Sequence, residues 1–343
     1  MKRSFLLIIS LLVIGSLLMA GCTPAQPATQ VAQPAATQAP AAAPEEEYIY
    51  VSSMGNLEFF NAHKYGWKWG GEALGVKATY VGPAEYDMNA MVAAFDQAIA
   101  KKPKGICVFA VEAILAPEID KATDAGIPVV TILGDLPDSK RIAYVGSYQY
   151  DLGFTGGKAI AEALGGKGKV AILSIPGVQM FDDREAGYRA AFEDYPEIEV
   201  VQVGDTKADT VTAVNVAKDI MQRNPDLAAF VGTDSTAGIG AATAVEESGK
   251  TGTVKVVAMD RNSDILQKIK TGTLTGTVAQ DDAAMAFWCL QVLYNFAHNQ
   301  APLTSDNKAA GVTTGPNNVF MWVNYIDKSN VDYFLTANET YTK

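Results

Sequence analysis

The sequence has 343 residues, with 27 Lys and Arg against 38 Asp and Glu, and its formal net charge is −11. The segment from Tyr48 to Lys343 is about 300 residues long, which is enough for two domains of typical size. An acidic chain without a basic patch is not expected to bind nucleic acid, so the charge is interpreted as favouring solubility.

The N-terminus has the pattern of a secretory signal. Lys2 and Arg3 precede an apolar run over 5–20. This run is short for a transmembrane span, which needs roughly 20 residues. Residues 1–21 are therefore predicted to be a signal peptide rather than an anchor helix, and they are not expected to be part of the folded domains.

The signal ends in the stretch LMAGC, which resembles the lipobox of bacterial lipoproteins. The resemblance implies that Cys22 becomes the acylated first residue of the mature chain and tethers it to a membrane. Residues 22–47 are rich in Pro, Ala and Gln, so they are predicted to be a disordered spacer. We expect an extracytoplasmic, lipid-anchored protein, which is periplasmic where an outer membrane exists.

Two further cysteines, Cys107 and Cys289, lie in apolar runs. An exported protein can pair its cysteines, but the sequence does not reveal how far apart these two lie. Buried free thiols are favoured here, and a disulfide stays open as the alternative.

Ten apolar runs are predicted to be strands. They are apolar without interruption, as expected of parallel strands that are covered on both faces. The segments between them have helical spacing, for example over 88–99 and 211–221, so the chain is predicted to be an α/β protein. The predicted strands are 48–54, 77–82, 105–110, 127–133, 141–146, 169–175, 199–204, 227–232, 254–260 and 274–280.

The strand pattern runs for five units, pauses, and then runs for five more. This predicts two doubly wound parallel-sheet lobes joined by a three-strand hinge. The N-terminal lobe is assigned residues 48–146 with 281–308. The C-terminal lobe is assigned residues 147–280 with 309–343.

The hinge requires the chain to pass between the lobes three times. The strand count places these crossings near 146–147, near 280–281 and within 305–316. Residues 281–299 are predicted to form a helix that returns to the first lobe. Residues 319–327 are predicted to be a terminal strand of the second lobe.

Polar and aromatic side chains follow nearly every predicted strand, where ligands bind in open α/β sheets. Planar polar groups can pair with hydroxyls, and aromatic rings can cover the C–H face of a pyranose, so this pattern predicts a sugar site. Other roles remain open: core contacts for the phenylalanines, helix caps for the residues at 233, 234 and 260, a surface ion pair for the arginine, and a hinge role for the glutamine. The candidate ligand-binding residues are Asn56, Phe59, Phe60, Asp135, Phe181, Arg184, Thr233, Asp260 and Gln280.

Stretches such as NLEFF, REAGYRAAF, VKVVAMDRN and GTLTGTVAQ resemble the periplasmic sugar-binding proteins of ABC transporters, of the ribose-binding type that shares its fold with LacI-type regulators. The resemblance implies that Phe59 and Phe60 stack on the sugar. It also implies that Arg184, Asp260 and Gln280 bind sugar hydroxyls. The implied partner is a membrane permease, and neither a cofactor nor a metal is implied.

The chain departs from the ribose-binding pattern at three places. Leu133 and the glycine after it stand where a ribose binder has Asp-Arg, and the nearest acid is Asp135. Ala208 stands in place of an aromatic residue, and Thr233 in place of an asparagine. We therefore expect a sugar other than ribose, with Phe181 supplying the missing ring.

Other function classes are less well supported. The sequence has no HExxH, GxSxG, P-loop or Cys/His cluster, and its two histidines are His63 and His298, so no enzyme is expected. A LacI-type regulator would need a DNA-binding headpiece. A sensor that presents its closed form to a chemoreceptor or histidine kinase stays open, as does a binder of a non-sugar polyol or nucleoside. A monomer is expected.

Overall fold

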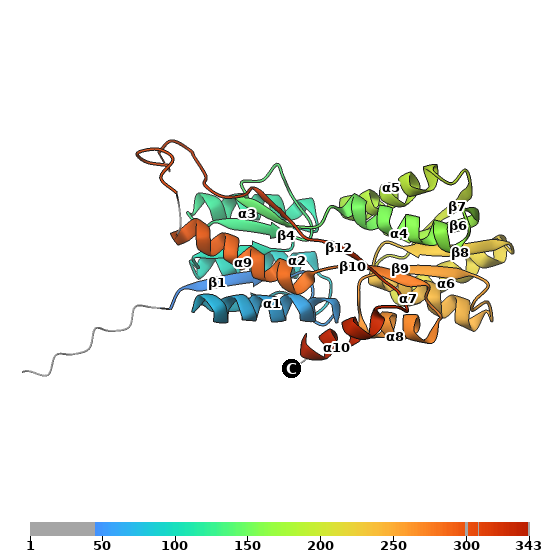
Figure 1. Ribbon diagram of the computed structural model, residues 1–343. Coiled ribbons are helices and arrows are strands. Elements are labelled where there is room, and N and C mark those ends of the chain that lie inside the picture. Colours follow the sequence, from blue (N-terminus) through green and yellow to red (C-terminus); the bar gives the residue numbers. More distant parts are fainter. Residues whose placement is uncertain (1–44, 299–300, 308, 342–343) are drawn as a thin grey trace, which may run out of the picture. The chain divides into compact units, whose positions relative to one another are not determined.

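The computed structural model describes residues 45–298, 301–307 and 309–341 (Figure 1). The predicted signal peptide, Cys22 and the spacer up to residue 44 lie outside the described residues. Within the described part, no helix combines the length and the apolar character needed to cross a membrane.

Two six-stranded sheets form the framework, and all ten predicted strands are confirmed. Each sheet contains five of the predicted strands. If these five are numbered in chain order within their sheet, the second lies at the edge and is followed by the first, third, fourth and fifth, as in a doubly wound fold. In spatial order, the first sheet contains β2 (Lys77–Val81), β1 (Glu47–Val51), β3 (Gly105–Val108), β4 (Val129–Ile132), β5 (Ala143–Gly146) and β11 (Asn318–Phe320). The second contains β7 (Glu197–Asp205), β6 (Lys167–Ser174), β8 (Leu227–Gly232), β9 (Lys255–Met259), β10 (Gly276–Gln280) and β12 (Val323–Ile326).

Helices cover both faces of each sheet, which explains why inner strands such as β3, β4, β5 and β10 are largely apolar and buried at every residue. On the first sheet, α1 (Phe59–Leu74) and α9 (Asp282–His298) pack together on one face, and α2 (Met88–Ala100), the 3₁₀ turn Ala113–Leu115 and α3 (Ala116–Asp124) lie on the other. On the second sheet, α4 (Gln149–Ala163) and α5 (Gln179–Glu193) form one layer, and α6 (Thr210–Arg223), α7 (Ser235–Glu247) and α8 (Ser263–Thr271) form the other. The last helix, α10 (Val331–Tyr341), contacts both α8 and α1 (Figure 1).

The third crossing between the sheets lies later than predicted. The sequence placed it within 305–316 and assigned 319–327 to a single strand of the second lobe. Instead, β11 pairs in parallel with β5 of the first sheet, and β12 pairs antiparallel with β10 of the second. The chain therefore crosses between the sheets at Met321-Trp322. The run predicted to be one strand forms two short strands, one in each sheet.

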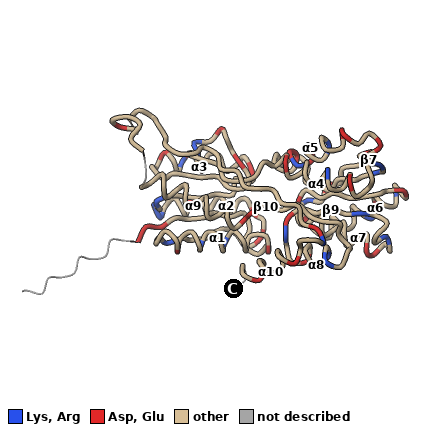
Figure 2. The backbone as a smooth tube through the Cα atoms, in the orientation of Figure 1, with Lys and Arg blue, Asp and Glu red and all other residues tan. Residues whose placement is uncertain are grey.

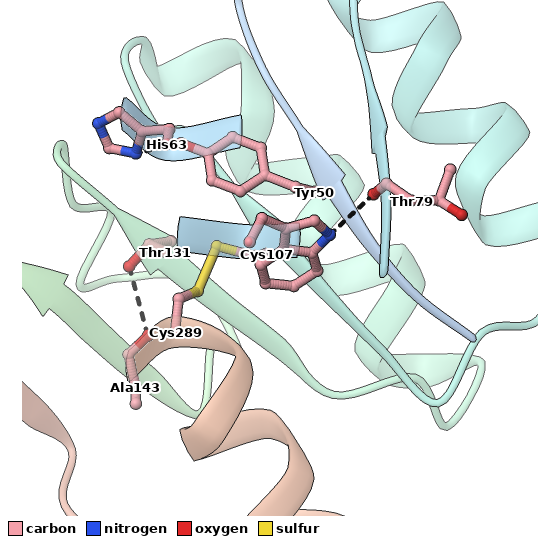
Figure 3. Close-up of a disulfide and its surroundings, with 8 residues drawn as sticks. Tyr50, His63, Thr79, Cys107, Thr131, Ala143 and Cys289 are labelled. Carbon is pink, nitrogen blue, oxygen red and sulfur yellow. Dashed lines mark hydrogen bonds between the residues drawn. A yellow bond between two sulfur atoms is a disulfide. The ribbon is translucent and has the colours of Figure 1, made fainter. Parts of the chain in front are cut away.

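The preference for free thiols was wrong. Cys107 in β3 and Cys289 in α9 form a disulfide, with 6.4 Å between their Cα atoms (Figure 3). Both residues are fully buried, because α9 lies across β3, β4 and β5. The disulfide ties the returning helix to the sheet that it covers, and joins residues 182 positions apart in sequence.

Candidate functional site

A cavity of about 430 Å³ lies where strands of both sheets end. Its lining includes residues that follow β1, β3 and β4 of the first sheet and β6, β8 and β9 of the second. This is the edge at which open α/β sheets bind ligands. Of the nine predicted ligand-binding residues, five line it: Phe59, Phe60, Phe181, Arg184 and Asp260.

The first-lobe wall of the cavity is aromatic at its centre. Phe59 and Phe60 open helix α1 directly after the loop that follows β1, so both rings lie at the cavity end of the sheet. The two rings meet edge to face with centroids 5.1 Å apart, and Phe60 also contacts Phe109, whose centroid is 5.8 Å away. Phe60 is 2% exposed, so it serves both the core and the cavity wall.

Arg184 is the fixed cation of the second-lobe wall. Its Nη1 donates to the backbone carbonyl of Thr233 at 2.6 Å, and its Nε donates to Oε1 of Gln149 at 2.8 Å. The guanidinium also lies over the Phe181 ring, 5.5 Å from its centroid. A glycine makes this placement possible, because a Cβ on Gly153 of α4 would lie 1.8 Å from the carbonyl oxygen of Arg184. Arg184 is thus pre-oriented, which lowers the entropic cost of holding a ligand.

Asp260 directly follows strand β9 in this wall and is 6% exposed. Burial raises the pKa of its carboxyl group to about 7, and the charges of Asp282 and Asp234 raise that pKa while Arg184 opposes them. Near neutral pH this carboxyl therefore exchanges readily between its protonated and ionised forms.

Asp234 lines the cavity although it is not among the nine predicted ligand-binding residues. It does cap α7, because Oδ1 accepts from the backbone N–H of Thr236 at 2.7 Å and of Ala237 at 3.1 Å. Its second oxygen, Oδ2, is buried without a hydrogen-bond partner among the described residues, and the residue lines the cavity. A carboxylate has two oxygens, so one residue can cap a helix and still accept from a ligand.

Backbone strain concentrates at the cavity. The non-glycine residues of the described chain with positive φ are Lys102, Leu133, Lys207, Ala208 and Asp260. All except Lys102 line the cavity. Such conformations cost of order 1–3 kcal/mol each and cluster at ligand sites, where the surrounding structure enforces them.

The other four predicted residues do not line the cavity. Asn56 donates to Oε1 of Glu85 at 3.0 Å. Asp135 accepts from Nη2 of Arg141 at 2.6 Å and from the Thr131 hydroxyl at 2.8 Å. These pairings explain why neither side chain is turned to the cavity.

Thr233 and Gln280 lie behind the second-lobe wall. The Thr233 hydroxyl donates to Oγ of Ser174 at 3.1 Å, and only the backbone carbonyl of Thr233 takes part in the site, by holding Arg184. Gln280 ends β10 at the second crossing, where it is 2% exposed and both amide atoms lack a hydrogen-bond partner among the described residues.

The two lobes touch on both sides of the cavity. On one side, Met180 belongs to the hydrophobic core of the first lobe although it lies in α5 of the second, and Phe181 packs beside it. On the other side, Oε1 of Glu58 accepts from both the backbone N–H and the hydroxyl of Ser263, at 2.9 and 2.6 Å. Charged residues of both signs are interspersed over the two lobes (Figure 2).

Comparison with known proteins identifies the family. A family model described as a periplasmic binding protein domain matches residues 48–301. The D-allose-binding periplasmic protein of Escherichia coli is 29% identical over 248 residues, which cover 69% of this chain and 80% of that protein.

Solved structures agree with this match over a longer stretch. The arabinose-binding protein AraP of Geobacillus stearothermophilus is 29% identical, with a TM-score of 0.76 over 85% of this chain and 99% of its own. A sugar ABC transporter sugar-binding protein of Bacillus halodurans is 28% identical, with a TM-score of 0.78 over 84% of this chain and 100% of its own. With two doubly wound lobes around one cavity, the chain belongs to the periplasmic binding protein family.

Proposed function

We propose that this chain is an extracytoplasmic receptor that captures a monosaccharide-type sugar between its lobes, closes on it, and delivers it to the permease of an ABC transporter. The single observation that carries the proposal is the composition of the cavity. Two phenylalanine rings that meet edge to face lie in one wall, and a fixed arginine with two buried carboxylates, Asp234 and Asp260, lies in the other.

The wall chemistry fits a sugar for two reasons. The C–H faces of a pyranose cover aromatic rings and gain from burial of apolar area. Its hydroxyls donate to carboxylate oxygens, and the buried Oδ2 of Asp234 has no partner among the described residues. The relatives named for allose and arabinose support the same ligand class.

Closure follows from binding to both walls. A sugar that touches both lobes binds the closed form more tightly than the open form. It therefore shifts the equilibrium between the open and closed forms by that difference in affinity. We propose that the movement occurs about the crossings at Gly146-Ser147, Gln280-Asp281 and Met321-Trp322. Delivery to a permease needs no chemistry from this chain, so we assign it no catalytic step and no cofactor.

A thermal-shift screen followed by calorimetry tests the ligand class. The screen would cover pentoses, hexoses, their deoxy and amino forms, inositols and disaccharides, with amino acids and nucleosides as the contrasting set. A sugar at a hundred times its Kd should stabilise the fold by about 2.7 kcal/mol. Stabilisation by amino acids or nucleosides alone would overturn the sugar proposal.

Small-angle X-ray scattering tests closure, and uptake assays test delivery. The sugar found in the screen should lower the radius of gyration. Strong stabilisation without compaction would contradict closure. Loss of signalling but not of sugar uptake on deletion of the gene would favour the sensor role over transport.

We also propose that Cys22 anchors the mature chain through lipid. The motif LMAGC directly before a Pro- and Ala-rich segment supports this. Cys22→Ser should leave an unprocessed precursor or release the protein from the membrane fraction. Mass spectrometry that found residues 1–20 intact on the mature protein would refute the proposal.

A further inference from the structure

The two walls of the cavity are chemically unlike. The first-lobe wall presents mainly carbon, and its polar lining residues are Ser53, Tyr86 and Glu112. The carbon comes from Met54, Leu57, Phe59, Phe60, Phe109 and Leu133. The second-lobe wall has apolar residues too, among them Ile175, Val178 and Phe181, but it alone carries Arg184, Asp234 and Asp260. Aromatic rings alone are compatible with any pyranose, because they cover its C–H faces. Aliphatic side chains are different, since a sugar hydroxyl that meets them finds no hydrogen-bond partner.

The polar groups near the first-lobe wall are occupied by one another. The hydroxyl of Tyr86 donates to Oε1 of Glu112. Asp135 is paired with Arg141, and Asn56 donates to Glu85. Two exceptions lie in this wall: the Ser53 hydroxyl is buried without a partner among the described residues, and Tyr86 engages only one of the two carboxylate oxygens of Glu112.

Leu133 is an aliphatic residue of the first-lobe wall whose backbone is held in a fixed conformation. It has φ +66° and is 1% exposed, and its backbone carbonyl accepts from both the Tyr144 hydroxyl and the Gln149 amide at 2.9 Å. These bonds fix the backbone at the cavity wall. The chain thus holds an aliphatic side chain in a strained conformation at the end of β4, where a polar side chain could have met a hydroxyl.

We propose that the ligand is a deoxy sugar whose deoxygenated part lies against the first-lobe wall, while its remaining hydroxyls bind Arg184, Asp234 and Asp260. This rests on the proposed sugar-binding function and narrows it. A fully hydroxylated hexose would bury at least one hydroxyl against carbon, and a buried hydroxyl without a partner is costly. An apolar wall rejects an added hydroxyl only moderately, so a preference of about 10- to 100-fold is expected.

Calorimetry with sugar pairs that differ by one hydroxyl tests this. The pairs are L-fucose and L-galactose, L-rhamnose and L-mannose, 6-deoxy-D-glucose and D-glucose, and 2-deoxy-D-ribose and D-ribose. In at least one pair the deoxy member should bind 10- to 100-fold tighter than its parent. Methyl glycosides of the parents form a further arm, because O-alkylation also presents an apolar group.

Leu133→Asn tests whether the wall causes the preference. Asparagine tolerates positive φ better than leucine, so the variant is expected to fold. It should reduce the deoxy preference at least tenfold by offering a partner to the added hydroxyl. Val211→Asn is the matched control, because Val211 lies in α6 away from the cavity lining and is 68% exposed. It should leave the ratio unchanged.

The outcomes separate this proposal from the one on which it rests. Parents that bind as tightly as their deoxy partners in every pair would overturn the deoxy proposal and leave sugar binding intact. Methyl glycosides that bind tighter than deoxy sugars would overturn it in favour of an alkylated sugar. A deoxy preference that Leu133→Asn leaves intact would also count against it. Failure of all sugars to bind would overturn both proposals.

Discussion

At the scale of single residues, the site depends on how each polar atom is occupied. Asp234 and Thr233 are neighbours after β8, yet their side chains differ in use. The Asp234 carboxylate caps a helix and offers a second oxygen to the cavity, whereas the Thr233 hydroxyl is turned to Ser174. Sequence position alone does not distinguish the two, because both follow the same strand end.

Substitution at these two positions should separate their roles. Asp234→Asn keeps the helix cap, since Asn and Asp are equivalent there, but it replaces a ligand acceptor by a donor. We expect sugar affinity to fall by about 5- to 150-fold, which corresponds to roughly 1–3 kcal/mol. Thr233→Val keeps the carbonyl that holds Arg184, so titration calorimetry should find its affinity within about threefold of wild type. Equal losses in both variants would contradict this assignment.

Asp260 should make sugar binding depend on pH. Its carboxyl has a pKa of about 7, because burial disfavours the charge. If sugar hydroxyls donate to the ionised form, binding weakens as pH falls through 7, and affinity should be about tenfold lower at pH 6 than at pH 8. The Asp260→Asn variant should bind weakly at both values. A wild-type affinity equal at pH 6 and pH 8 would rule out the ionised form as the binding form.

The same carboxyl should affect stability in the opposite direction. In the unfolded chain its pKa is 3.8, so between pH 4 and 7 the folded state holds a proton that the unfolded state has lost. The free energy of unfolding without ligand should therefore fall as pH rises through this range and level off above it. Asp260→Asn should remove this slope in urea titrations. The difference should be at most about 4 kcal/mol, and a slope that persists unchanged in the variant would assign it to another group.

At the scale of elements, the contact between Glu58 and helix α8 joins the two lobes next to the cavity. The carboxylate of Glu58 lies just before Phe59 in the first lobe and binds the first backbone N–H of α8 in the second. A negative charge at a helix N-terminus also interacts favourably with the helix dipole. The contact thus stabilises this arrangement of the two lobes, and we infer that it is the arrangement in which both walls meet a ligand.

Glu58→Gln should weaken sugar binding by about fivefold, because losing the charge at the helix end costs about 1 kcal/mol. Ser263→Ala removes the partner hydroxyl and serves as the other corner of a double-mutant cycle. The two changes should not be additive in calorimetry, because they remove one interaction. Additive effects would show that Glu58 acts on Phe59 rather than across the lobes.

At the scale of the whole molecule, the disulfide between Cys107 and Cys289 holds the returning helix on the first sheet. It closes a loop that spans 182 residues and therefore contains the entire second sheet except β12. A cross-link over so long a loop restricts the unfolded chain strongly. Its effect should thus reach the stability of the whole chain rather than one lobe alone.

Replacing both cysteines by serine should lower the free energy of unfolding by about 2–5 kcal/mol. Urea unfolding of the double variant, compared with oxidised and reduced wild type, measures this. Reduced wild type should resemble the variant. If oxidised and reduced wild type unfolded at the same urea concentration, the two thiols would not be linked in the folded protein.

The sequence by itself determined the strands, the two lobes and the cavity residues Phe59, Phe60, Phe181, Arg184 and Asp260. All of these depend on local patterns: uninterrupted apolar runs, helical spacing and the residue types that follow a strand. Parallel strands place their carboxyl ends at one edge, so those residues converge on the cavity wherever their side chains are free.

Only the tertiary structure decided three features: the disulfide, the crossing at Met321-Trp322, and the position of the Asp135 side chain outside the cavity lining. Each depends on a partner distant in sequence or on a choice between equivalent partners: Cys107 needs α9 above β3, and Asp135 binds Arg141 instead of facing the cavity. Local periodicity contains no information on such contacts, because they form when separate elements pack. The placement of Phe59 and Phe60 in one wall and of Arg184, Asp234 and Asp260 in the other has the same origin, since the two walls come from different lobes.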